Sequence, residues 1–217
     1  MFTQILWTQF KWTRAMLAIC AVVTFSLPAL AWRIGDAGMN APGPVAVMRG
    51  MSALGPVLMM TAILIGFLLV AHIWNIDGAA KHVYALSLPL PWRRYVAMRF
   101  GAGALALLVP TLALWLGCLL ALALIELPAT LHAYPGALAF RFLLGALLAY
   151  SLSFLLQYAA GRRAPVVLLA ILVGVLLTAT LMSTFGYTKT LAWITHVLTD
   201  WPGPLAIYVN EWKLIDV

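Results

Sequence analysis

The chain has 217 residues, of which 65% are apolar and only 9% are charged, and its formal net charge is +7. A soluble domain carries about 25% charged residues and about 45 to 50% apolar ones, so this composition excludes a soluble protein and predicts an integral membrane protein. The positive charge would suggest nucleic acid binding in a soluble protein. Membrane proteins, however, concentrate basic residues in cytoplasmic loops, and we expect no nucleic acid partner.

Residues 1–14 predict an amphipathic helix that lies in the cytoplasmic interface of the membrane. Its aromatic and aliphatic residues share one broad arc, and Lys11 and Arg14 lie mostly opposite. The apolar run that follows also resembles the core of a signal peptide, because Ala29-Leu30-Ala31 matches a cleavage site. We favour retention of residues 1–31, since the amphipathic segment before the run is unusually long.

Five apolar runs are each long enough to form a membrane-spanning helix, which needs about 20 residues. They contain no Asp, Glu, Lys or Arg, and the prolines inside three of them predict kinks. The fold class is therefore an all-α, polytopic membrane helix bundle that forms a single transmembrane domain over residues 1–217. The predicted spans cover residues 16–32, 52–74, 100–125, 142–160 and 164–185.

The distribution of loop charges predicts the orientation. With a cytoplasmic N-terminus, the inside segments contain eight basic residues and one acidic residue, whereas the outside segments contain five of each. Basic residues favour the cytoplasmic side, so the N-terminus is predicted to be cytoplasmic. Residues 186–217 then form an outer tail, in which charged residues interrupt every apolar run, so a sixth span is either short or missing.

The sequence contains no recognisable catalytic or nucleotide-binding motif. No glycine directly precedes a lysine, which excludes a P-loop, and no close pair of carboxylates could divide acid and base roles. Cys20 and Cys118 lie inside apolar runs and predict neither a disulfide nor a metal site. His72 and His82 are expected to be solvated or interfacial rather than haem ligands. We therefore expect no enzyme activity and no cofactor in this chain.

The segment between the second and third predicted spans carries the most information. Asp77 can cap a short helix that runs to about Leu86, and Pro89 and Pro91 then force an extended break before Trp92. The pattern predicts a rigid cytoplasmic helix over residues 77–88. The alternative is an ordinary basic loop whose prolines end one helix before the next begins.

This segment resembles the one that joins the second and third spans in permease subunits of bacterial ABC-2 type transporters. The matching residues are Asp77, Gly78, Leu86, Ser87, Leu88, Pro89, Arg93 and Tyr95. The resemblance implies that residues 77–88 form a coupling helix, which docks into a groove on a separate cytosolic ATPase. The residues it assigns to this contact are Asp77, Gly78, Lys81, Leu86, Pro89 and Arg93.

The same resemblance implies a multi-pass protein of the bacterial inner membrane that pairs with a second permease chain, either identical or related. ATP and magnesium would bind to the partner ATPase. The uncharged spans suit export or translocation of an amphiphilic or apolar substrate. ABC-2 permeases usually have six spans, and this chain departs from that number. Two alternatives remain open, a membrane anchor or assembly subunit without transport activity and a membrane enzyme that uses isolated polar groups.

Overall fold

The computed structural model describes the chain except for residues 1, 38–43, 80–90, 125–131, 185–186, 201, 204, 210–211, 213 and 217. The chain divides into two compact units. Unit 1 comprises Met1–Ser151 together with Glu211–Val217, and unit 2 comprises Leu152–Asn210. The predicted coupling helix lies between the second and third predicted spans, and the described residues on both sides of it belong to unit 1.

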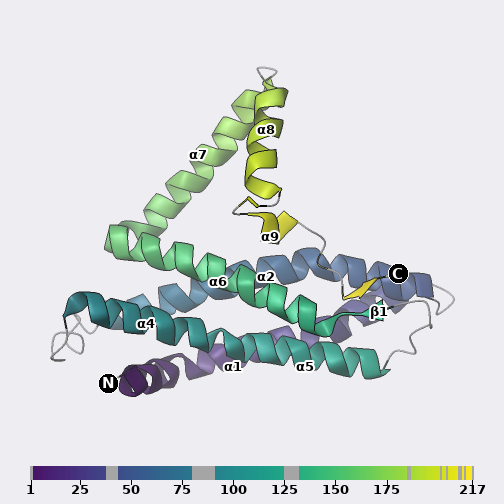
Figure 1. The fold of residues 1–217 in the computed structure, drawn as a ribbon, viewed down its shortest axis with the longest axis horizontal. Helices are drawn as coiled ribbons and strands as arrows, with labels where there is room; N and C mark the ends of the chain where they lie inside the picture. The colour runs from purple at the N-terminus through teal and green to yellow at the C-terminus, as the bar shows by residue number, and fades with distance from the viewer. Residues whose placement is uncertain are drawn as a thin grey trace. The chain divides into compact units, whose positions relative to one another are not determined.

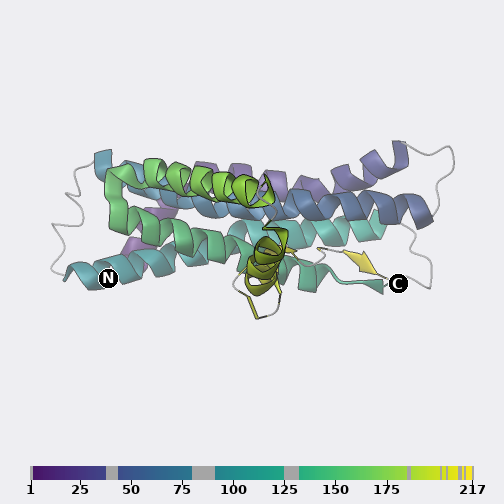
Figure 2. The same cartoon turned by 90° about the horizontal axis from the view of Figure 1, so that it is seen from above.

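Unit 1 is built from long helices that lie side by side (Figures 1 and 2). In it, α1 packs against α2, α4 and α5. Four helical segments, Phe2–Leu30, Leu54–Ile76, Trp92–Leu124 and Pro135–Ala160, are long and apolar enough to cross a membrane. They overlap the first four predicted spans, which supports the prediction of a helical membrane protein. The helices are α1 (Phe2–Ala37), α2 (Pro44–Ala79), α4 (Trp92–Ala106), α5 (Leu108–Leu124) and the first part of α6 (Pro135–Ala160).

The N-terminal segment is part of α1 and does not form a helix of its own, which differs from the prediction for residues 1–14. Its first turns lie at an angle to the rest of α1 (Figure 1). Ile5, Gln9, Thr13 and Leu17 are buried. Residues four apart share a helix face, so this stripe directs one side of α1 into unit 1. An interfacial position for these turns stays a prediction.

The third predicted span begins earlier than expected and is interrupted. The helical segment starts at Trp92 rather than at residue 100, and α4 and α5 are separated at Leu107. The cause is Pro110, which has no N–H to donate to the carbonyl of Ala106, four residues earlier. The predicted disturbance at Pro110 is therefore observed, whereas α1 and α2 continue through Pro28 and Pro56.

Small residues bring the helices of unit 1 into close contact. A Cβ atom at Gly66 of α2 would lie 2.6 Å from the carbonyl oxygen of Ala146 in α6. Gly117 of α5 similarly faces the backbone of Phe25 in α1. Thr24 of α1 donates a hydrogen bond of 3.0 Å to the carbonyl of Pro110. Such contacts are typical of membrane helices, where small residues and hydroxyl groups mediate packing.

The segment after unit 2 returns to unit 1, which the prediction of an outer tail did not include. β2 (Ile215–Asp216) pairs antiparallel with β1 (His132–Ala133), so the fold contains a small sheet in addition to its helices. Trp212 is 5% exposed and lies against Gly55, and the guanidinium carbon of Arg141 is 5.7 Å from its ring centroid. Figure 1 places this segment at the opposite end of unit 1 from the N-terminus.

Unit 2 contains the end of α6, the short helix η1 (Gly161–Arg163), α7 (Ala164–Thr184), α8 (Thr188–Thr199) and α9 (Ala206–Val209). The fifth predicted span coincides with α7. Its apolar part, Val166–Met182, is shorter than the four candidate spans, so a fifth crossing stays a prediction. After α8, the N–H of Gly203 donates a hydrogen bond to the carbonyl of Asp200.

Candidate functional site at the basic end of unit 1

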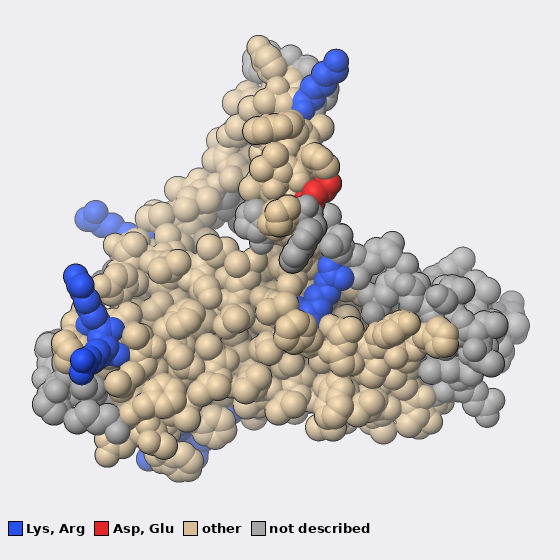
Figure 3. Space-filling model, in the orientation of Figure 1, with Lys and Arg blue, Asp and Glu red and all other residues tan. Residues whose placement is uncertain are grey.

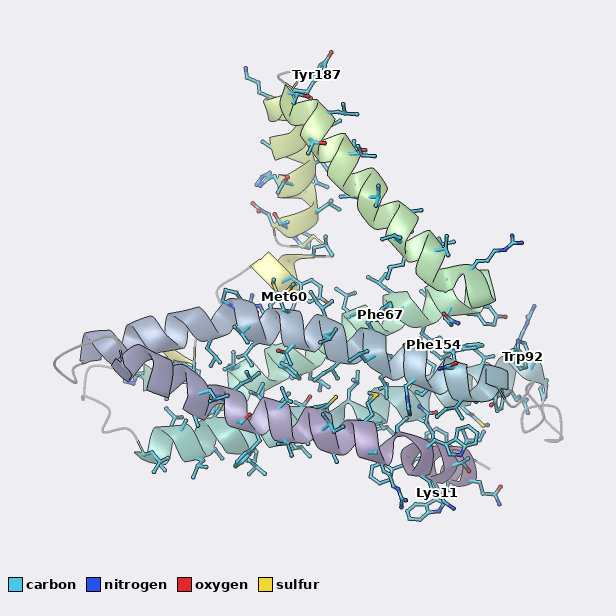
Figure 4. The ribbon with its side chains drawn as sticks, turned by 180° about the vertical axis from the view of Figure 1, so that it is seen from behind. Lys11, Met60, Phe67, Trp92, Phe154 and Tyr187 are labelled. Atoms are coloured by element: carbon cyan, nitrogen blue, oxygen red, sulfur yellow. The ribbon has the colours of Figure 1, made fainter. Side chains whose placement is uncertain are left out.

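Exposed basic residues gather at the end of unit 1 where α1 and α4 begin. Figure 4 labels Lys11 and Trp92 at this end. Lys11 and Arg14 are exposed on α1, and Arg93 and Arg94 are exposed in the first turn of α4. Figure 3 shows Lys and Arg side chains at the left end of unit 1 and uncharged ones over most of its other described surface. We call these four residues the basic end.

A buried arginine lies behind the basic end and connects three helices. Arg99 of α4 is only 4% exposed. It donates hydrogen bonds to the hydroxyl of Tyr95 and, over 3.2 Å, to the carbonyl of Ile73 in α2. Its guanidinium carbon also lies 5.9 Å from the ring centroid of Trp12 in α1. A guanidinium is suited to this role, because it donates several hydrogen bonds and attracts aromatic faces.

Sequence reasoning missed the role of Arg99, which it counted as one more loop charge. The apolar run begins at Phe100, so hydropathy alone places Arg99 just outside the span. The available signal was helical spacing. Tyr95 and Arg99 are four residues apart, and residues at that spacing are neighbours on a helix surface.

Further polar groups of α1 and α2 lie at the same end. Gln9 is 4% exposed, and neither atom of its side-chain amide has a hydrogen-bond partner among the described residues. The hydroxyl of Thr13 donates to the backbone carbonyl of Gln9 over 2.9 Å. The Nε2 atom of His72 lies 3.3 Å from the carbonyl oxygen of Trp12. Since a carbonyl can only accept, this Nε2 carries the hydrogen in the contact. His72 is half-buried, and its solvated or interfacial position stays a prediction.

The α6 helix joins this region through Tyr150. The Tyr150 hydroxyl donates 3.1 Å to the carbonyl of Phe100, and the two ring centroids are 5.3 Å apart. Gly103 of α4 faces the same ring and has no room for a side chain. Residues of α1, α2, α4 and α6 therefore converge behind the basic end.

An apolar groove lies between the first turns of α1 and the α4–α5 segment. Its volume is about 490 Å³, and it is open on one side. The side chain of Trp7 is 70% exposed at this groove. The lining residues are Thr3, Leu6, Trp7, Phe10, Ala102, Leu105, Ala106 and Val109.

Three of the predicted coupling residues, Lys81, Leu86 and Pro89, lie outside the described residues, as does His82. Asp77 and Gly78 belong to the last turns of α2, which continues to Ala79. A residue that caps a helix N-terminus has non-helical backbone angles. The prediction that Asp77 begins a separate helix is therefore wrong, because α2 extends further than the apolar run indicated.

The extended backbone predicted before Trp92 is observed at Pro91. Pro91 precedes the helix with extended backbone angles, φ −63° and ψ 139°, and its carbonyl accepts hydrogen bonds from the N–H groups of Arg94 and Tyr95. The ring of Trp92 stacks on that of Tyr95 at 5.7 Å. Arg93 is thus placed on an ordered first turn, with its side chain exposed.

The described part of the chain holds no group of three or more His, Cys, Asp or Glu residues that could bind a metal ion. Cys20 and Cys118 are free and buried. The chemistry of the basic end is therefore that of cations, aromatic rings and hydrogen-bond donors. No family model, curated protein or solved structure matches the chain.

Proposed function

We propose that the chain is the permease subunit of an ATP-driven transporter of the ABC-2 type, which receives mechanical work from a separate cytosolic ATPase. The observation that carries this proposal is the arrangement of the basic end. The end of α2, the start of α4 and the exposed basic residues of α1 lie at the same end of unit 1. The proposed coupling segment, residues 77–88, begins in the last turns of α2 and is followed by the start of α4.

The contacts of Arg99 support a mechanical role for this end. The residue connects α4 to the Ile73 carbonyl near the end of α2 and to the Trp12 ring of α1. A displacement of the coupling segment would pull on α2 and α4 together, because both flanks are joined by this buried arginine. Packed helices transmit such displacements as rigid bodies. We infer that the ATPase moves α1, α2 and α4 as one body.

The positions of the two ends of the chain support the predicted topology. The N-terminus and residues 212–216 lie at opposite ends of unit 1 (Figure 1). An odd number of crossings, such as the predicted five, separates the two ends in this way. With the basic end in the cytoplasm, as the positive-inside rule favours, the β1–β2 sheet faces outward. The protein would then work in the bacterial inner membrane beside a second permease chain.

The substrate class follows from the apolar helices. The candidate spans expose large apolar side chains and include no acidic residue. Carriers that bind ions usually place acidic residues near the middle of the membrane. We therefore propose an amphiphilic or apolar substrate whose export depends on ATP hydrolysis by the partner.

Copurification with an ATPase tests the proposal. The tagged chain is isolated from its native membrane, and the bound ATPase is identified and assayed for ATP-driven transport in proteoliposomes. Leu86→Ala and Arg93→Ala should release the ATPase and abolish ATP-driven transport. Lys189→Ala is the matched control, since this exposed residue lies in the predicted outer tail.

Three results would contradict the proposal. If the ATPase stays bound and transport is unchanged in both variants, residues 77–88 and Arg93 are not the coupling site. If the chain copurifies with a complex that contains no ATPase, the anchor alternative replaces transport. Turnover of a small substrate by the isolated chain would instead identify a membrane enzyme.

A further inference from the structure

We propose that the groove between α1 and α4–α5 binds an acyl chain of an anionic phospholipid, whose phosphate contacts Lys11 and Arg14. This site does not depend on coupling to an ATPase, and it would be present in an anchor or an enzyme as well. The proposal rests on the shape of the groove, on its lining and on the charges beside it.

Each wall of the groove is one face of a helix. The lining residues of α1 are Thr3, Leu6, Trp7 and Phe10, and those of the opposite wall are Ala102, Leu105, Ala106 and Val109. Both sets follow the i, i+3, i+4, i+7 spacing of a single helix face. Seven of the eight side chains are apolar, and the volume of about 490 Å³ lies within the range of about 300 to 1,000 Å³ for small-molecule sites. The lining is therefore suited to a hydrocarbon chain.

The α4–α5 wall of the groove combines two buried alanines with larger apolar residues. Ala102 and Ala106, one helical turn apart, are 1% and 6% exposed. The adjacent Gly101 lies against the ring of Phe2, with 3.7 Å between its Cβ position and the ring. The small side chains of Ala102 and Ala106 thus allow α1 to approach this wall closely.

Two basic side chains of α1 lie one helical turn beyond residues that line the groove. Lys11 follows Trp7 by four residues and Arg14 follows Phe10 by four, and residues at this spacing lie about 5 to 6 Å apart between Cβ atoms. Both are exposed, and neither has an ion-pair partner among the described residues. Arginine binds phosphate oxygens with two parallel hydrogen bonds, and lysine adds a point charge. A zwitterionic lipid would place its own cation near these residues and would bind less well.

Fluorescence quenching by lipids tests the site. The full chain is reconstituted in phosphatidylcholine vesicles. One series contains increasing amounts of brominated phosphatidylglycerol, and the other contains increasing amounts of brominated phosphatidylcholine. The fluorescence of Trp7 is obtained as the difference between the tryptophan fluorescence of the natural chain and that of Trp7→Phe. We expect Trp7 to be quenched at a lower fraction of brominated phosphatidylglycerol than of brominated phosphatidylcholine, and this preference should shrink at high salt.

Removal of the two charges should abolish most of the preference. A basic residue near an anionic surface contributes a factor of about five, so Lys11→Gln with Arg14→Gln should lower the preference roughly 30-fold. Arg163→Gln, which removes an exposed basic residue of unit 2, is the matched control and should change nothing. Leu105→Phe keeps both charges but fills the groove at a position that is 45% exposed, and quenching of Trp7 should fall.

Equal quenching by the two brominated lipids in the natural chain would show contact with bulk lipid only and would overturn the proposal. If the preference for phosphatidylglycerol survives the double replacement, Lys11 and Arg14 do not bind the phosphate, and the headgroup part of the proposal is wrong. Undiminished quenching of Trp7 in Leu105→Phe would show that the acyl chain does not lie in the groove. If the double variant fails to fold, Arg14→Gln alone should still lower the preference about fivefold, and an unchanged value would count against the site.

Discussion

Replacement of Gln9 by leucine should stabilise the protein, although it removes a polar group beside the candidate site. The Gln9 side chain is 4% exposed, and its amide oxygen and nitrogen have no hydrogen-bond partner among the described residues. A buried polar group without a partner costs about 1 to 3 kcal/mol. Leucine has no polar atom and a similar volume, so Gln9→Leu should raise the free energy of unfolding by about 1 to 3 kcal/mol. The backbone carbonyl that binds Thr13 is unaffected.

Thermal unfolding in detergent, followed by circular dichroism, measures this effect. In a protein of this size, 1 kcal/mol corresponds to about 2 to 4 °C in Tm, so a gain of 2 kcal/mol predicts about 4 to 8 °C. Gln4→Leu is the matched control, because Gln4 is exposed on the same helix and its replacement should change stability by less than about 0.5 kcal/mol. A lower Tm for Gln9→Leu would refute the reasoning, since the amide would then be making a stabilising contact.

Three further substitutions test the packing of unit 1 by the same measurement. Gly66→Ala should destabilise by about 1 to 3 kcal/mol, because its Cβ would lie 2.6 Å from a carbonyl of α6, whereas Gly136→Ala, with nothing within 4 Å, should be tolerated. Equal Tm values for these two variants would contradict the observed helix approach. Trp212→Ala should cost about 3 to 5 kcal/mol, since the side chain is buried against unit 1, and an unchanged Tm would exclude that packing. Thr24→Val should cost about 0.5 to 1.5 kcal/mol through loss of the hydrogen bond to Pro110, and an unchanged Tm would show that this bond does not stabilise the fold.

The helices of unit 1 could be predicted largely from the sequence, because a membrane span is determined by the length of an uncharged apolar run. The start of α4 at Trp92 also follows from local chemistry, since Pro91 restricts the chain before it. The ends of α1 and α2 could not be predicted from the sequence. These helices extend beyond their apolar runs into polar sequence, where hydropathy carries no signal about helix length.

The candidate site was predicted less well than the fold. Exposed Arg93 was identified from its position after the prolines, but buried Arg99 was counted as a loop charge. Burial of a charge depends on partners from other helices, here the Ile73 carbonyl and the Trp12 ring. Such tertiary contacts leave no periodic pattern in one segment of sequence. The return of Trp212 to unit 1 was missed for the same reason.

The division of the chain has a consequence for how the protein is made. Unit 1 is interrupted in sequence, since all of unit 2 is translated between Ser151 and the residues that pair with β1. Leu214 is fully buried, and its carbonyl accepts a hydrogen bond from Tyr134 over 2.9 Å. The contacts of Trp212 with Gly55 and of Leu214 with Tyr134 therefore form only after synthesis has passed residue 214. A ribosome that stalls within unit 2 would leave unit 1 without its β1–β2 pairing and without the packing of Trp212.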